Sequence, residues 1–126
     1  MKNSMTIMVY EDPGHGWARF PLSRLVDLGI ADQITPYSYV RGRYAYLEQD
    51  CDLATLVKAL YNRGYEVKYK THHTDRTSKI RGYDRYAWWR LPIGTLISLR
   101  ATGGKLSRTS PWAPEGKTVP ELRLAA

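Results

Sequence analysis

Residues 52–71 read DLATLVKALYNRGYEVKYKT, and two apolar periods follow one another within this stretch. In residues 52–63 the apolar side chains recur at three- and four-residue spacing, which predicts an amphipathic helix. Gly64 follows as a helix-ending residue, because glycine readily adopts the left-handed conformation that closes a helix. Residues 65–71 then alternate aromatic or β-branched residues with charged ones, which predicts a strand with two unlike faces.

Outward from this stretch, the chain repeats the same mixture of elements. Two upstream hairpins are predicted, one around the turn residues 12–16 and one around Arg41-Gly42, where glycine and proline interrupt β-rich runs. Strands are expected at residues 6–10, 17–20, 37–40, 43–47, 65–71 and 95–99, a short helix at 22–29, a long polar loop at 72–82, and either element at 83–90. The order β-β-α-β-β-α-β with a further C-terminal strand predicts an α+β fold, in which a small antiparallel or mixed sheet has two helices on one face.

The length and charge of the chain suggest one basic domain. Its 126 residues fit a single domain, predicted at residues 1–100, and the Gly-, Ser- and Pro-rich residues 101–126 are expected to form a loosely ordered tail. The net charge is +7, and it is uneven. Residues 1–62 hold six Lys/Arg and seven Asp/Glu, whereas residues 63–126 hold thirteen and five, a net of +8. This asymmetry favours an anionic partner such as nucleic acid.

Several classes of protein are excluded or disfavoured. The single cysteine, Cys51, rules out an intrachain disulfide framework and a cysteine-cluster zinc site. The apolar runs are too short to span a membrane, and the first ten residues lack the apolar core of a secretory signal, so a cytoplasmic location is expected. The sequence contains neither a phosphate-binding P-loop nor a dinucleotide fingerprint, and no cofactor is expected.

The candidate binding surface is a stretch in which basic and aromatic residues interleave. Arginine forks clamp phosphates and aromatic rings stack on unpaired bases, so this composition suits a single-stranded or irregular nucleic acid. The alternative is a solvated strand with an aromatic stripe that belongs to the core. The residues are Arg76, Lys79, Arg81, Tyr83, Arg85, Tyr86, Trp88 and Trp89.

Catalysis, if present, would depend on the histidines. His15 lies between two glycines, and His72 lies close to Asp75 and Ser78, which could supply an orienting carboxylate and a hydroxyl. His72 and His73 are adjacent and would point to opposite faces of a strand, so they would not chelate together. Because the spacing matches no preset metal motif, no metal site is predicted, whether with Asp12 or with Asp75.

An acidic group precedes the second helix. Glu48, Asp50 and Asp52 could belong to a two-metal nuclease site, but capping of the helix by Asp50 or Asp52 is the simpler interpretation. Cys51 lies within this group, and its predicted state is buried and inert.

Four separated blocks carry a resemblance to a known family. They are YEDPGHGW at 10–17, YSY at 37–39, YLEQDCD at 46–52 and HTDRTSKIR at 73–81. Over roughly residues 6–86 the chain resembles a family of small uncharacterised proteins encoded on bacteriophages, prophages and plasmids. No catalytic residue carries over from that family. The resemblance implies a mobile-element context inside a bacterial host cell, in which accessory proteins such as anti-CRISPRs act against host defence.

Three functions follow as hypotheses. We favour a non-enzymatic binding protein that inhibits a bacterial nucleoprotein defence complex through a basic, aromatic-rich surface, with that complex or nucleic acid as its partner. The rival is a small enzyme, a nuclease or group-transfer modifier, that uses His15 with His72 or His73. A DNA-binding regulator is the third, although no helix-turn-helix pattern is visible.

Overall fold

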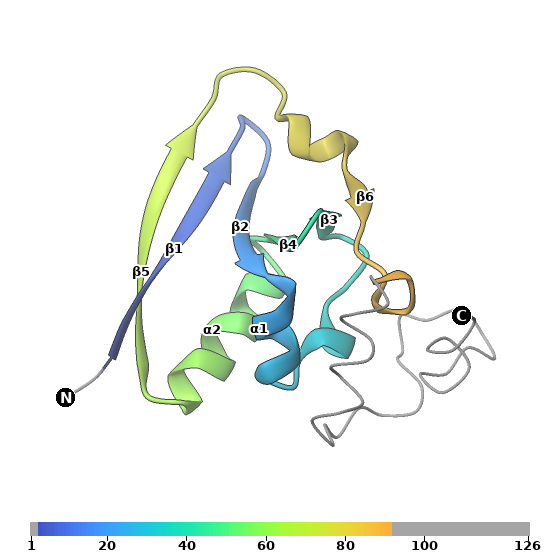
Figure 1. Ribbon diagram of the computed structural model, residues 1–126. Helices are drawn as coiled ribbons and strands as arrows, with labels where there is room; N and C mark the ends of the chain where they lie inside the picture. Colours follow the sequence, from blue (N-terminus) through green and yellow to red (C-terminus); the bar gives the residue numbers. More distant parts are fainter. Residues whose placement is uncertain (1–2, 92–126) are drawn as a thin grey trace.

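Six strands form one mixed sheet in the order β5-β1-β2-β4-β3-β6 (Figure 1). The structure is a computed structural model, and it describes residues 3–91. The strands are β1 (Asn3–Glu11), β2 (Gly16–Pro21), β3 (Tyr39–Arg41), β4 (Tyr44–Glu48), β5 (Tyr65–His73) and β6 (Asp84–Arg85). The helices are α1 (Leu22–Asp27) and α2 (Asp52–Asn62), with 3-10 turns η1 (Ala31–Gln33), η2 (Lys79–Gly82) and η3 (Trp88–Arg90).

The pairing of the strands makes the sheet mixed. β1 pairs antiparallel with β2, and β4 pairs antiparallel with both β2 and β3. β5 pairs in parallel with β1 over its whole length, from Asn3↔Tyr65 to Glu11↔His73. A parallel neighbour requires a crossover, and α2 lies in the connection that leads to β5. The predicted α+β class, with a mixed sheet, is therefore confirmed.

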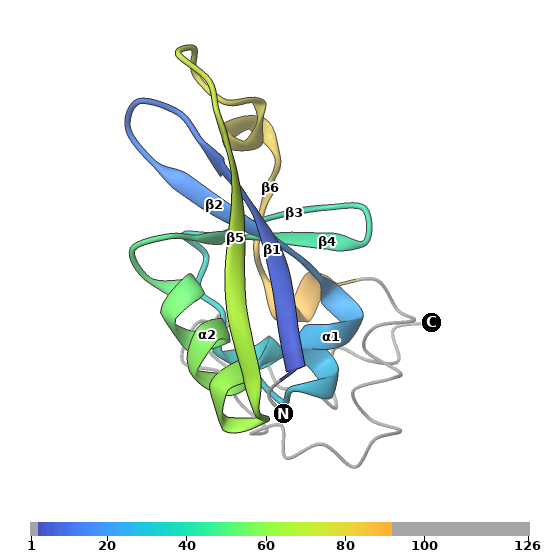
Figure 2. The ribbon, with the colours of Figure 1, turned by 90° about the vertical axis from the view of Figure 1, so that its left-hand side faces the viewer.

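Both helices cover the same face of the sheet, as Figure 2 shows. α2 turns Leu53, Leu56 and Leu60 inward, in agreement with its predicted apolar stripe. They pack with Ile7, Val9, Ala18, Phe20, Ala45 and Leu47 from the sheet and with Leu22, Leu25 and Val26 from α1. Because these strand residues alternate, the intervening residues of the same strands point to the opposite face. We call this opposite face the free face.

The segment after β5 differs from the prediction in detail. β5 continues to His73, so the predicted loop begins later, and it ends in the 3-10 turn η2. Residues 83–90, for which strand and helix were both considered, form the two-residue strand β6 and the turn η3. The strand expected at residues 95–99 and the tail at 101–126 lie outside the described residues. Within residues 3–91, no helix has the length and apolar character to cross a membrane.

The acidic group before α2 does not cap that helix, which corrects the prediction. The N-cap residue is Cys51, and its side chain makes no capping hydrogen bond. Asp52 is instead buried and accepts hydrogen bonds from the Thr35 backbone N–H, the Thr35 hydroxyl and the Ser38 hydroxyl. Its carboxylate thereby anchors the loop that leads into β3.

The prediction that Cys51 is buried was also wrong, because this residue is exposed. Desolvation of the thiol and the adjacent Asp52 carboxylate both raise the pKa of Cys51. A raised pKa keeps the thiol protonated and disfavours a role as nucleophile.

Candidate functional site

The free face is basic and aromatic. One row of cross-strand neighbours runs over all six strands: Lys70, Met8, Arg19, Tyr46, Tyr39 and Arg85. A second row holds His72, Tyr10, Trp17 and Glu48. On the side of the first row away from the second, the same face also carries Lys68, Arg41 and Tyr44. The strands therefore present five Lys/Arg side chains on this face against two carboxylates, Glu48 and Glu66.

Arginines on this face stack on tyrosine rings. The guanidinium carbon of Arg19 lies 4.8 Å from the Tyr44 ring centroid and 5.9 Å from that of Tyr10. Arg41 lies 5.2 Å from the Tyr83 ring centroid. Such stacking holds a guanidinium over one ring face and leaves its N–H edges free to bind an anion.

The tyrosines themselves form a chain of ring contacts. Tyr46 meets Tyr10 at 6.3 Å and Tyr83 edge-on at 5.2 Å, and Tyr10 stacks on the ring of His72 at 5.4 Å. Tyr44 is 38% exposed, and Tyr10, Tyr46 and Tyr83 are half-buried. Burial raises the pKa of Tyr46, and the neighbouring Tyr83 raises it further. The Tyr46 phenol therefore stays neutral at physiological pH, and the partly exposed rings of this chain keep accessible π surface for stacking.

Residues 74–83, which we call the arm, connect β5 to β6 across one end of the free face (Figure 1). Ile80 in the arm is buried against Trp17 and Tyr39. Asp12, in the β1–β2 turn, accepts two hydrogen bonds from the Arg81 guanidinium, at 2.7 and 2.9 Å, and one from the Ser78 N–H. The hydrogen bonds from the Arg81 guanidinium hold the pKa of Asp12 well below its usual range, with a smaller contribution from the backbone N–H groups that also donate to this carboxylate.

The sequence blocks around Asp12 and Arg81 therefore form one structural unit. The same carboxylate accepts hydrogen bonds from the N–H groups of Gly14 and His15, so it also shapes the turn. A Cβ atom on Gly14 would lie 3.0 Å from a guanidinium nitrogen of Arg81, so a side chain there would require the Arg81–Asp12 pair to shift. Thus Arg81, predicted as a phosphate ligand, is largely engaged in holding the arm.

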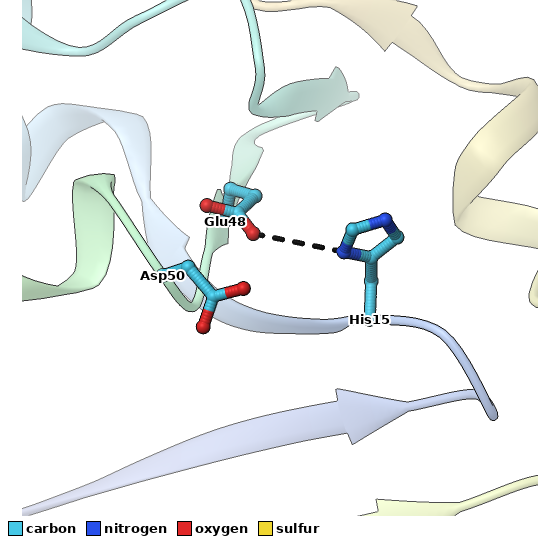
Figure 3. Close-up of side chains that lie close together, drawn as sticks. All are labelled: His15, Glu48 and Asp50. Atoms are coloured by element: carbon cyan, nitrogen blue, oxygen red, sulfur yellow. Dashed lines mark ion pairs between the residues drawn. The ribbon is translucent and has the colours of Figure 1, made fainter.

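A pocket of about 370 Å³ opens beside the arm on the free face. It is lined by His15, Trp17, Tyr37, Tyr39, Glu48, Cys51, Arg81 and Arg85. Figure 3 shows His15 and Glu48 facing one another there, with His15 Nδ1 at 3.8 Å from a Glu48 carboxylate oxygen. Asp50 completes a group whose ligand atoms all lie within 4.8 Å of one another.

The predicted histidine groupings differ from the observed ones. His15 pairs with Glu48, His72 stacks on Tyr10, and His73 pairs with Asp75 at 3.1 Å. The Ser78 hydroxyl accepts a hydrogen bond from the Ile80 N–H, and the Ser78 N–H donates to Asp12, so Ser78 does not join His72. The three histidines thus have three different settings.

The predicted binding residues divide between two faces. Arg76, Lys79 and Arg85 are exposed, and Tyr83 is half-buried on the free face. Tyr86 and Trp88, in contrast, are 1% and 0% exposed and belong to the core on the helix side, as the alternative interpretation holds. The Tyr86 hydroxyl donates a hydrogen bond to the Ala31 carbonyl. The side chain of Trp89 lies outside the described part of the chain.

Several residues of the free face were missed by the sequence analysis. Arg19 and Tyr10 lie in the predicted first hairpin, and Tyr44 and Tyr46 lie in the strand predicted at residues 43–47, but no function was assigned to them. The alternation of tyrosine with aliphatic residues in 44–47 was the sequence feature that could have placed Tyr44 and Tyr46 on one face of the sheet. Comparison with protein-family models, curated proteins and solved structures found no match for this chain.

Proposed function

We propose that this protein binds single-stranded nucleic acid on the free face of its sheet. The observation that carries the proposal is the stacking of Arg19 between Tyr44 and Tyr10, within the row that runs from Lys70 to Arg85. Cationic groups there would contact the phosphates, and exposed rings would stack on the bases.

A single strand fits this face better than a duplex. Bases must be unstacked from their neighbours before a protein ring can stack on them, which a duplex does not allow. The sheet also offers no helix for a major groove, because α1 and α2 both cover its other face (Figure 2). The proposed regulator that reads duplex DNA is therefore the weaker alternative.

The counter-defence role predicted from the resemblance gives this proposal a setting. A guide RNA or a displaced DNA strand in a nucleoprotein defence complex is a single strand of the required chemistry. We propose such a strand as the target, with inhibition by occupancy at about one molecule per complex.

The test is fluorescence anisotropy with labelled single-stranded and duplex oligonucleotides in the presence of EDTA. We expect Arg19→Ala and Tyr44→Ala each to weaken single-strand binding about 5- to 100-fold, because one stacked base contributes about 1–3 kcal/mol. The logarithm of the binding constant should fall with the logarithm of salt concentration with a slope of about −2 to −3, since single strands give about −0.7 per neutralised phosphate.

Lys58→Ala and Tyr61→Ala are the matched controls, because both residues are exposed on α2. They remove the same kinds of group from the opposite face and should leave the affinity unchanged. No binding at low salt, or equal losses in the α2 variants, would overturn the proposal.

A further inference from the structure

Three side chains of the types that bind metals lie close together at the pocket, two of them, His15 and Glu48, in its lining and the third, Asp50, beside them. His15 leaves the β1–β2 turn, Glu48 ends β4, and Asp50 lies in the turn before α2 (Figure 3). The Gln49 N–H donates a hydrogen bond to the Gly16 carbonyl at 2.9 Å, which holds the two turns together. The backbone therefore fixes the approach of these side chains.

The distances suit one shared cation. Two ligand atoms that each lie about 2.1 Å from a metal ion can be at most about 4.2 Å apart. His15 Nδ1 and the Glu48 oxygen, at 3.8 Å, satisfy this limit as they stand. The full set spans no more than 4.8 Å, and exposed Asp50 can close the remaining gap by a side-chain rotation.

The surroundings favour a bound cation and an anion next to it. Glu48 is only 13% exposed at its side chain, so its charge is better compensated by a partner than by water. Trp17 lines the same pocket, is 2% exposed, and its indole N–H has no acceptor among residues 3–91. Arg85, held over the ring of Tyr39, supplies positive charge on the other side of the pocket, and Arg81 lies beside it over the ring of Trp17, paired with Asp12.

We infer that His15, Glu48 and Asp50 form a binding site for a divalent transition-metal ion. One imidazole nitrogen and two carboxylates make a mixed N/O set that suits Zn²⁺ or Mn²⁺ better than Mg²⁺, which prefers oxygen ligands alone. Three protein ligands leave further coordination positions open towards the pocket. This site was not predicted, because the sequence analysis paired His15 only with Asp12 and the other histidines.

The open positions fit a phosphate oxygen. A metal-bound phosphate would lie beside Arg81 and Arg85 on the face proposed to bind nucleic acid, which explains two carboxylates at the border of a basic surface. This part rests on the proposed function, whereas the metal site itself does not.

The test of the site uses the full-length protein and the metal alone. Isothermal titration calorimetry with Zn²⁺, and Mn²⁺ binding followed by electron paramagnetic resonance, should show one ion per chain. His15→Ala, Glu48→Gln and Asp50→Asn should each weaken binding at least about tenfold, because each removes one ligand of a small set. Circular dichroism confirms that each variant is folded.

His73→Ala and Asp75→Asn are the matched controls, since they remove an exposed His–carboxylate pair with an even shorter separation. They should leave the affinity unchanged. Absence of binding, or equal weakening in the His73 and Asp75 variants, would show that His15 and Glu48 form an ion pair only and would overturn the inference.

The phosphate step is tested separately by oligonucleotide titration with and without Zn²⁺. We expect the metal to raise single-strand affinity in the wild type and not in Glu48→Gln, because the two ligands are then thermodynamically linked. Binding in EDTA with no effect of metal would refute the phosphate step and leave the free-face proposal standing.

Discussion

At the scale of single residues, Asp12 has the clearest predictable effect, because its carboxylate joins the β1–β2 turn to the arm through Arg81 and Ser78. Its pKa is depressed in the folded state, so the ionised form stabilises the fold above the unfolded value of about 3.9. That stabilisation decreases as the pH falls below about 4 and continues to decrease towards the folded pKa. We therefore expect Asp12→Asn to lower the melting temperature at pH 7, and its difference from the wild type to shrink below pH 4.

Thermal unfolding from pH 2.5 to 8 checks this, with Asp75→Asn as the control. Asp75 has a side chain that is 98% exposed and pairs only with His73 among the contacts described, so its loss should have little effect. A difference for Asp12→Asn that stays constant down to pH 2.5 would contradict the role given to its charge.

At the scale of elements, the end of α2 determines how the chain enters β5. Gly64 has a φ of 85°, in the left-handed region where a side chain is strained. Gly64→Ala should lower the free energy of unfolding by about 1–2 kcal/mol, the cost of that conformation for a residue with a Cβ atom. Chemical denaturation of the wild type and of Gly64→Ala measures this difference in the free energy of unfolding.

Gly82→Ala provides the comparison within the same chain. Gly82 has no positive φ, and an added Cβ would meet no atom within 4 Å. Alanine there should leave stability unchanged or raise it slightly, because it restricts the unfolded chain. Equal losses in the two variants would show that the conformation of Gly64 is not the cause.

At the scale of the whole molecule, the described residues provide the core between the sheet and its helices. Tyr86, Trp88 and Leu91 are buried in the same cluster as residues from β1, α1 and α2. We expect truncation after Ala101 to leave the melting temperature unchanged, since residues 102–126 hold few apolar side chains to offset about 1–2 kcal/mol of backbone entropy per ordered residue.

Calorimetry of the truncated chain, together with oligonucleotide binding, separates the possible roles of this segment. Weaker binding at an unchanged melting temperature would indicate that the segment orders on the partner. A large fall in the melting temperature would instead show that Trp112 or Leu122 completes the core and that the predicted domain boundary is wrong.

Local patterns in the sequence were sufficient to predict most of the elements before residue 72. The helix at 52–63 and the two hairpins follow from periodicity and turn residues, because side-chain direction depends on the backbone over only a few residues. The mixed composition also sufficed for the α+β class. Periodicity was ambiguous after residue 83. The aromatic residues Tyr86 and Trp88 fitted both an exposed binding surface and a buried core.

Tertiary structure alone decided the site. The row from Lys70 to Arg85 depends on the register of six strands, and that register is set by turn geometry and by which side chains of distant segments pack into the common core. The same holds for Asp12 with Arg81 and for His15 with Glu48, since no spacing rule connects residues on different turns. Local sterics thus determine which way a side chain points, whereas only the packed chain determines which side chains it meets.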